Sequence, residues 1–230
     1  MKYGIVVFPG SNCDHDAWYA ASANAGCKAE YLWHKDTCIP SDIDCIILPG
    51  GFSYGDYLRC GAISRFSPIM KEVIEFAGKG GYVIGICNGF QILSESGLLP
   101  GALLRNSSLN FICRDIYLAP VNRNTAFTSA IPENKALRVP IAHNEGNYFA
   151  GQDLIDEMES DGRIIFKYCN PEGIIDESSN PNGSINNIAG IVNKKGNVLG
   201  MMPHPERYSD LELGCSDGIF IFESLKDNFK

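Results

Sequence analysis

Short apolar runs alternate with helical patterns through the first hundred residues of the chain. The apolar runs have the length of strands, and we expect strands at residues 3–8, 27–33, 44–48 and 81–86. Between them, apolar residues at helical spacing predict helices over 14–25 and 67–78. Strands that alternate with helices are typical of an α/β fold, an open and mainly parallel sheet with helices on both faces.

The second half of the chain is less regular. We expect a small antiparallel sheet from the apolar runs at 111–119 and 136–142, followed by a helix over 153–160 and a strand over 163–169. The segment 177–187 is rich in turn residues and is predicted to be an exposed loop. Strands at 188–192 and 198–202 and a helix over 217–226 complete the pattern. Without a repeat or a long linker, residues 1–230 are expected to form a single domain.

Composition and charge narrow the class of protein. The chain has 230 residues, of which 45% are hydrophobic and 20% charged, and its net charge of −8 disfavours nucleic acid and anionic membrane surfaces as partners. The start of the chain is predicted to be a strand and not a signal peptide, and no apolar run approaches the roughly 18 residues of a membrane span. The nine cysteines are scattered without a C-x-x-C pair, so we expect neither a disulfide framework nor a metal site, and a cytoplasmic location.

The segment Gly85-Ile86-Cys87-Asn88-Gly89 carries the clearest chemical signal. It follows an apolar strand and begins a helical pattern, which is the arrangement of a nucleophile elbow with a thiol in place of a hydroxyl. The start of a helix offers unpaired N–H groups and a partial positive charge, and both favour a thiolate. Cys87 is therefore our candidate nucleophile.

A cysteine nucleophile needs a base, a group that orients the base, and donors for the oxyanion. His204 follows an apolar strand, and Glu206 lies two residues later, where its carboxylate can hold the imidazole. The N–H of Asn88, next to the nucleophile, is in the usual place for one oxyanion donor. Gly51 ends another strand without a side chain to obstruct a second donor. No member of this set is specific alone, but each lies at the end of a predicted strand.

Weaker candidates surround this set. His143 with Glu145 suits an acid–base pair or metal ligands, but a loop that shapes the substrate pocket or the partner surface is favoured. The run 13–16 holds metal-like residue types, yet Asn12 or Asp14 capping the first helix explains it better. Asp56 and Arg59, in the loop after Gly51, are candidates for contacting a partner or shaping the pocket.

The combination Gly-Ile-Cys-Asn-Gly-Phe-Gln at 85–91 with Pro-His-Pro-Glu at 203–206 resembles the class I, triad-type glutamine amidotransferases. The resemblance implies a flavodoxin-like α/β fold, with Cys87 as nucleophile, His204 as general base and acid, and Glu206 as the residue that orients it. It also implies that Gly51 and Asn88 supply the oxyanion donors and that Gln91 contacts the bound glutamine.

Three further segments narrow the resemblance. Phe-Pro-Gly-Ser-Asn-Cys-Asp at 8–14, Pro-Gly-Gly-Phe-Ser-Tyr-Gly-Asp-Tyr-Leu-Arg at 49–59 and Ala-His-Asn-Glu-Gly at 142–146 are similar to the glutaminase subunits of phosphoribosylformylglycinamidine synthase. The similarity extends from the start of the chain to about residue 222. The sequence departs from this family at His15, where arginine is often found, and at Asn144, where glycine is common.

This resemblance implies that the chain hydrolyses glutamine to glutamate and ammonia through a cysteinyl thioester. The ammonia would pass to a synthetase subunit, which uses ATP to convert formylglycinamide ribonucleotide to formylglycinamidine ribonucleotide in de novo purine biosynthesis, with a small accessory subunit as a further partner. The chain has no G-x-x-x-x-G-K-[ST] motif, so we expect no cofactor here and place ATP and magnesium on the synthetase. The alternatives are another class I amidotransferase glutaminase, a stand-alone γ-glutamyl hydrolase and a non-catalytic binding module.

Overall fold

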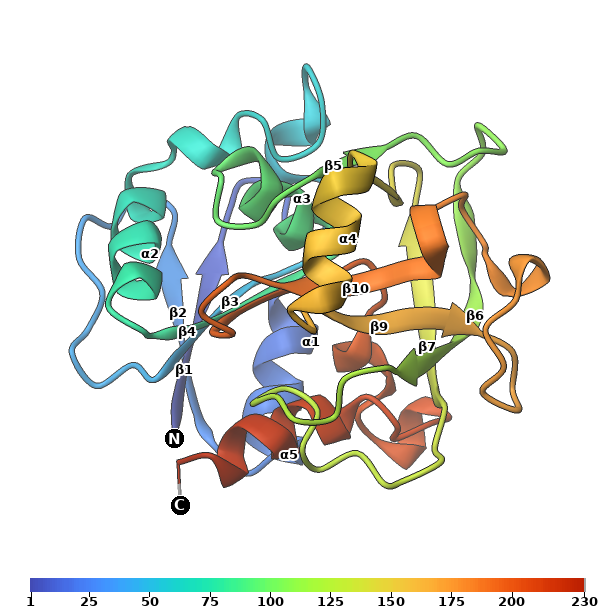
Figure 1. Cartoon of the computed structure of the whole chain (residues 1–230). Coiled ribbons are helices and arrows are strands. Elements are labelled where there is room, and N and C mark those ends of the chain that lie inside the picture. The colour runs from blue at the N-terminus through green and yellow to red at the C-terminus, as the bar shows by residue number, and fades with distance from the viewer. Residues whose placement is uncertain (230) are drawn as a thin grey trace.

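The computed structural model describes residues 1–229, which build a nine-stranded mixed sheet with helices on both faces (Figure 1). The strand order is β2-β1-β3-β4-β11-β10-β9-β6-β7, and the strands from β2 to β11 are parallel while the rest pair antiparallel. These strands are β1 (Lys2–Val7), β2 (Lys28–Trp33), β3 (Cys45–Leu48), β4 (Tyr82–Ile86), β6 (Ile112–Pro120), β7 (Leu137–His143), β9 (Ile164–Cys169), β10 (Ile188–Val192) and β11 (Val198–Met201).

Two groups of helices cover the sheet. The helices are α1 (Asp14–Tyr19), α2 (Pro68–Gly78), α3 (Asn88–Glu95), α4 (Gln152–Ser160) and α5 (Ile219–Asp227), and α1 continues as a π-helical turn over Ala20–Asn24. Figure 1 shows α1 and α5 on one side of the sheet and α2, α3 and α4 on the other. Pro68 is the first residue of α2, where its missing N–H has no intrahelical partner to lose. The fold class predicted from the sequence is confirmed.

The central parallel strands carry the core. All four residues of β3 are buried, as expected for a strand covered by helices on both faces. Strand β4 lies between β3 and β11, so three parallel strands end side by side. The carboxyl ends of such strands are where α/β sheets place their sites, and the segments after β3, β4 and β11 contain Gly51, Cys87 and His204.

Two expectations need correction. The predicted antiparallel strands do pair, as β6 and β7, but they extend the main sheet. The separate two-stranded sheet consists instead of β5 (Ala102–Leu104) and β8 (Asn147–Phe149). The segment 177–187 is not simply an exposed loop, because it buries Asn182, Ser184 and Asn187. Asn182 Nδ2 donates to the Gly146 carbonyl at 2.8 Å, and this contact ties the segment to the loop after β7. Among residues 1–229, no helix has the length and apolar content needed to cross a membrane.

Candidate active site

The backbone at Cys87 has the strained geometry of a nucleophile elbow. Cys87 adopts φ 51° and ψ −105°, a conformation that L-residues rarely occupy, immediately before α3 begins. The flanking glycines serve a different purpose from the one expected, since neither has a positive φ. A Cβ on Gly89 would overlap the Leu48 carbonyl oxygen of β3, and one on Gly85 would overlap the backbone of Gly89. The glycines therefore permit close packing, and the turn itself is made by the cysteine.

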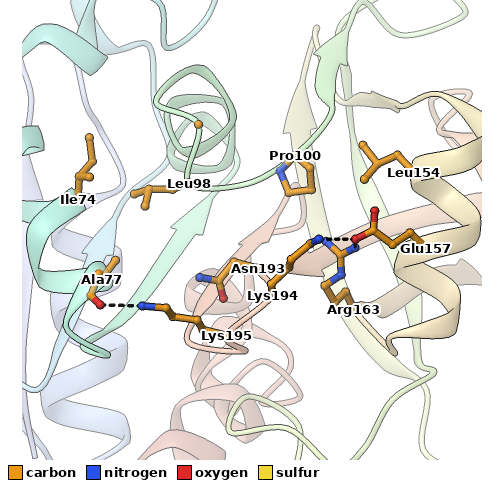
Figure 2. A pocket seen from close by; sticks show the side chains of 12 residues that line it. Ile74, Ala77, Leu98, Pro100, Leu154, Glu157, Arg163, Asn193, Lys194 and Lys195 are labelled. Carbon is orange, nitrogen blue, oxygen red and sulfur yellow. Dashed lines mark hydrogen bonds and ion pairs between the residues drawn. The ribbon is translucent and has the colours of Figure 1, made fainter.

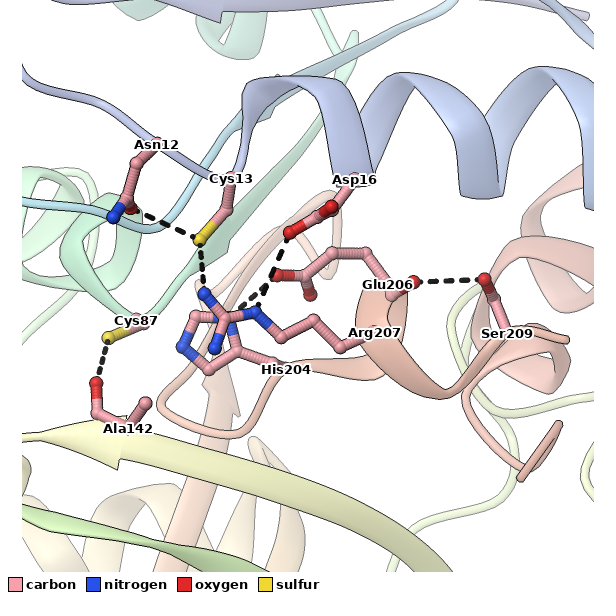
Figure 3. A network of polar contacts seen from close by, with 9 residues as sticks. All are labelled: Asn12, Cys13, Asp16, Cys87, Ala142, His204, Glu206, Arg207 and Ser209. Carbon is pink, nitrogen blue, oxygen red and sulfur yellow. Dashed lines mark hydrogen bonds and ion pairs between the residues drawn. The ribbon is translucent and has the colours of Figure 1, made fainter. Parts of the chain in front are cut away.

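The Cys87 thiol lies against the end of β7. The side chain is buried, and its thiol donates to the Ala142 carbonyl at an S···O distance of 3.7 Å (Figure 3). The Cys87 N–H donates to the Met201 carbonyl at 2.8 Å, so the elbow is also fixed to the end of β11. Both contacts come from segments far along the chain, and they place the sulfur close to the histidine that follows β11.

His204 and Glu206 form a buried pair on the other side of this sulfur. His204 Nδ1 lies 2.6 Å from Glu206 Oε1, and both side chains are at most 2% exposed. Figure 3 shows the Nε2 side of the ring directed towards Cys87. Burial opposes the charged imidazole, but Glu206 and Cys87 together raise the pKa of His204 well above its ordinary value. The arrangement therefore favours an imidazole that accepts a proton at Nε2 while Nδ1 is held by the carboxylate.

The backbone N–H groups of Gly51 and Asn88 are the two candidate oxyanion donors. Gly51 has φ 140°, and a Cβ there would overlap the backbone of Ser11 and Asn12. In residues 1–229, the N–H groups of Gly51 and Asn88 donate no hydrogen bond. The Asn88 side chain joins the two segments, because its Oδ1 accepts from the Ser53 N–H at 3.2 Å. The positions of the two donors are thus coupled through one buried amide.

Gln91 lies one turn further along α3, and both ends of its amide are hydrogen-bonded. Its Oε1 accepts from Asn88 Nδ2 at 2.9 Å, and its Nε2 donates to the Glu145 carbonyl at 2.7 Å. Asn88 Nδ2 also reaches Asp56 Oδ1 at 3.2 Å, and burial raises the pKa of that aspartate. Gln91 thus connects the nucleophile helix to the 143–146 segment. Arg59, by contrast, turns away and pairs with Glu95 at 2.5 Å.

His143 is held by a buried asparagine that sequence reasoning missed. Asn106 Nδ2 donates to the carbonyls of Asn110 and His143, and its Oδ1 accepts from the Gly146 N–H. That oxygen also lies 3.0 Å from His143 Nδ1, so Nδ1 carries the proton and Nε2 is an unprotonated acceptor. Burial, with a smaller contribution from His204, lowers the pKa of His143 to about 4. The loop-fixing interpretation of His143 agrees with these contacts.

The Cys13–Asp16 run lies behind the triad. Cys13, not Asn12 or Asp14, occupies the N-cap position of α1, and no side chain caps that helix, so the capping prediction is wrong. Ligand atoms of Cys13, His204 and Glu206 lie within 4.8 Å of one another, a spacing that could hold a metal ion. However, Arg207 Nη2 donates to Cys13 Sγ at 2.9 Å, so a guanidinium already supplies the positive charge there (Figure 3). The run therefore packs against the triad through Cys13, and its contact with Arg207 could not be read from the local sequence.

Comparison with known sequences places this site in a family. A sequence model of the CobB/CobQ-like glutamine amidotransferase domain matches residues 1–213. The chain is 58% identical to phosphoribosylformylglycinamidine synthase subunit PurQ of Chlorobaculum parvum, over 98% of this chain and 89% of that protein. It is 56% identical to the subunit of the same name from Moorella thermoacetica, over 99% of this chain and 96% of that protein.

Solved structures agree with these relatives. A chain in the structure of PurLQS from Thermotoga maritima superposes with a TM-score of 0.87 at 42% identity, covering 100% of this chain and 99% of that one. A second glutamine amidotransferase from Thermotoga maritima superposes with a TM-score of 0.55 at 16% identity, covering 99% of this chain and 91% of that one, a likeness of fold alone.

Proposed function

The chain belongs to the family of CobB/CobQ-like glutamine amidotransferase domains, and from that premise we propose that it is the glutaminase subunit of phosphoribosylformylglycinamidine synthase. The observation that carries the proposal is the site itself, in which a strained Cys87 faces a buried His204–Glu206 pair 2.6 Å apart. Relatives that carry this subunit's name match the chain over nearly its whole length. We assign the roles of nucleophile, base and orienting carboxylate to these three residues.

The first half of the reaction releases ammonia. Cys87 Sγ attacks the carboxamide carbon of glutamine while His204 Nε2 takes the thiol proton, and the resulting oxyanion accepts from the Gly51 and Asn88 N–H groups. One such donor is typically worth about 2.7–4 kcal/mol in the transition state. His204 then gives its proton to the nitrogen as the C–N bond breaks, which leaves ammonia and a γ-glutamyl thioester. Its raised pKa favours the form that holds this proton between the two steps.

The second half regenerates the enzyme. His204 Nε2 removes a proton from water, and the hydroxide attacks the thioester carbon with the same two N–H groups holding the oxyanion. The C–S bond breaks, glutamate departs, and the proton returns to the Cys87 sulfur. Glu206 keeps Nδ1 protonated and the ring oriented throughout.

The ammonia has to be used before it reaches bulk water, where most of it becomes ammonium and is no longer nucleophilic. We therefore propose that the chain delivers it to a synthetase subunit that makes formylglycinamidine ribonucleotide with ATP and magnesium, within an assembly that includes a small accessory subunit. The matched chain in the PurLQS structure supports such an assembly. We propose no cofactor for this chain and a cytoplasmic location, in keeping with nine cysteines that are all free.

The experiment that tests this function separates the two half-reactions. In the complex with the synthetase, Cys87→Ala should lower glutamine-dependent product formation by about 10³-fold or more, because the nucleophile is lost. Product formation from ammonium chloride should be unchanged, since that route bypasses the thioester. Cys113→Ser, at an exposed cysteine on β6, is the matched control and should retain both activities.

Two outcomes would reject the proposal. Hydrolysis of γ-glutamyl peptides by the isolated chain, without stimulation by the synthetase, would favour a stand-alone hydrolase. Unchanged glutamine use in the Cys87→Ala complex would leave the chain as a binding module.

A further inference from the structure

One cavity in the described part of the chain lies away from the triad. It has a volume of about 570 Å³, a size typical of small-molecule sites. Its walls come from the end of α2, the segment after α3, one face of α4, the start of β9 and the turn between β10 and β11 (Figure 2). Helix α3 begins after Cys87 and ends just before Gly97 and Leu98, which line the cavity. The cavity is therefore at the opposite end of the sheet from the nucleophile.

The charged lining of this cavity is cationic, although the chain is acidic. Arg163, Lys194 and Lys195 face a single lining carboxylate, Glu157, which gives the lining a net charge of +2. The chain as a whole carries −8. The positive lining creates a local potential that attracts anions, although the net charge of the whole molecule repels them.

Arg163 is the buried cation of this site. Its side chain is only 4% exposed, and its guanidinium lies 2.9 Å from Glu157 and 3.2 Å from Asp161. Both contacts are ion pairs without well-aligned hydrogen bonds, so the guanidinium is neutralised by charge and not held in a bidentate fork. An arginine fork matches the oxygens of a phosphate better than it matches two separate carboxylates met by single atoms.

The two lysines are incompletely compensated. Lys194 Nζ lies 2.6 Å from Glu157 Oε1, the oxygen that Arg163 also approaches, so two cations share one carboxylate oxygen. Lys195 Nζ is held by a neutral partner, the Gly78 carbonyl, at 2.8 Å. The three cations of the cavity are therefore opposed by two carboxylates, Glu157 in the lining and Asp161 beside Arg163, which leaves an excess of one positive charge.

The remaining walls are apolar. Ile74, Leu98, Pro100 and Leu154 face the cavity opposite and above the cationic side (Figure 2). A free inorganic anion would leave these side chains in contact with water, whereas a ligand with a flat ring would cover them. From the cations and the apolar wall together, we propose that this cavity binds a small phosphomonoester that carries a ring, of which a nucleoside monophosphate is the representative member.

The test is a titration of the full chain with adenosine monophosphate and with phenyl phosphate, followed by calorimetry. Lys194→Glu, at a side chain that is 73% exposed, should retain the fold and weaken binding about tenfold or more, because it removes one phosphate partner and adds a negative charge. Lys28→Glu changes the charge equally on an exposed residue of β2 and should leave the affinity unchanged.

Inorganic phosphate and adenosine separate the two halves of the ligand. Each should bind at least about tenfold more weakly than adenosine monophosphate, because each lacks one of the two contact surfaces. No binding of either phosphomonoester at millimolar concentration would overturn the proposal. Equal affinity for inorganic phosphate would overturn the ring contact, and equal weakening by Lys28→Glu would show that binding reflects net charge alone.

Discussion

The two ends of the sheet differ in how closely their residues are packed. At the carboxyl end, Cys87, His204 and Glu206 are buried, and glycine backbones touch neighbouring strands with no room for a methyl group. At the other end, an open cavity of about 570 Å³ is bordered by exposed lysines and a buried, ion-paired arginine. Helix α3 connects the two.

The difference follows from what each end has to do. A nucleophile and its base act only when their atoms are held in one geometry, and close packing around them provides that geometry. A cavity for an anion needs charge and space, and flexible, exposed lysine side chains can supply the charge without one fixed geometry. Substitutions at the two ends should therefore differ in kind: those at the carboxyl end should alter rate and stability sharply, and those at the cavity should alter affinity.

Glu206→Gln should give the largest effect of the substitutions that preserve shape. The amide keeps the size of the carboxylate but no longer favours the protonated Nδ1 that the imidazole needs, so glutaminase kcat in the complex should fall about 10³–10⁴-fold. Glu212→Gln, at an exposed residue nearby in the chain, is the control and should be silent. A loss of less than tenfold would mean that Glu206 does not orient the base. Phosphomonoester binding at the cavity should be unaffected.

Gly89→Ala and Gly78→Ala place one methyl group at each end of the sheet. At Gly89 the methyl would meet the Leu48 carbonyl of β3, so the substitution should lower the free energy of unfolding by about 3 kcal/mol. At Gly78, the last residue of α2, nothing lies within 4 Å of the added Cβ, so a change of between zero and about 1 kcal/mol in favour of folding is expected. Urea unfolding of the two variants measures the difference, and equal effects would contradict the contrast between the ends.

The fold was largely predictable because its signals are local. Buried strands such as β3 are continuous apolar runs, and α2 combines helical periodicity with a proline at its first position. Strands β5 and β8 have three residues each and no clear alternation, so nothing in their sequence distinguishes them from loops. Whether β6 and β7 join the main sheet depends on pairing with β9, about fifty residues away for β6, which a local pattern cannot report.

The candidate site divides in the same way. Cys87, His204 and Glu206 could be found because each sits at a strand end in a recognisable spacing, and the structure brings them together. Asn106 and Cys13 could not, because the contacts that matter to them cross 37 and 194 residues of chain. Arg163 lies between a glycine and the first residue of β9. It lines a cavity only because α4 and the β10–β11 turn pack around it.

His143→Gln should produce the smallest effect, a change in how stability depends on pH. The pKa of His143 is about 4 in the folded chain against an ordinary value near 6.5, so between these values the unfolded chain binds more protons. Folding is therefore favoured fully above pH 6.5 and progressively less as the pH falls towards 4. From this residue alone, the wild-type chain should lose about 1 kcal/mol between pH 7 and pH 5.5. The variant should lack that part of the decline.

The comparison of the two proteins isolates His143 from its neighbours. His204 has a raised pKa and contributes stability that is lost as the pH rises, which is the opposite slope, but it is present in both proteins. His34, whose pKa is lowered mainly by burial, is also common to both. His15→Gln, at an exposed histidine, should retain the wild-type decline. No histidine lines the cavity, so the loss of stability in acid that comes from histidines is assigned to the catalytic end. The free energy of unfolding, measured with urea between pH 7 and pH 5.5, would contradict that assignment if it fell equally for wild type and His143→Gln.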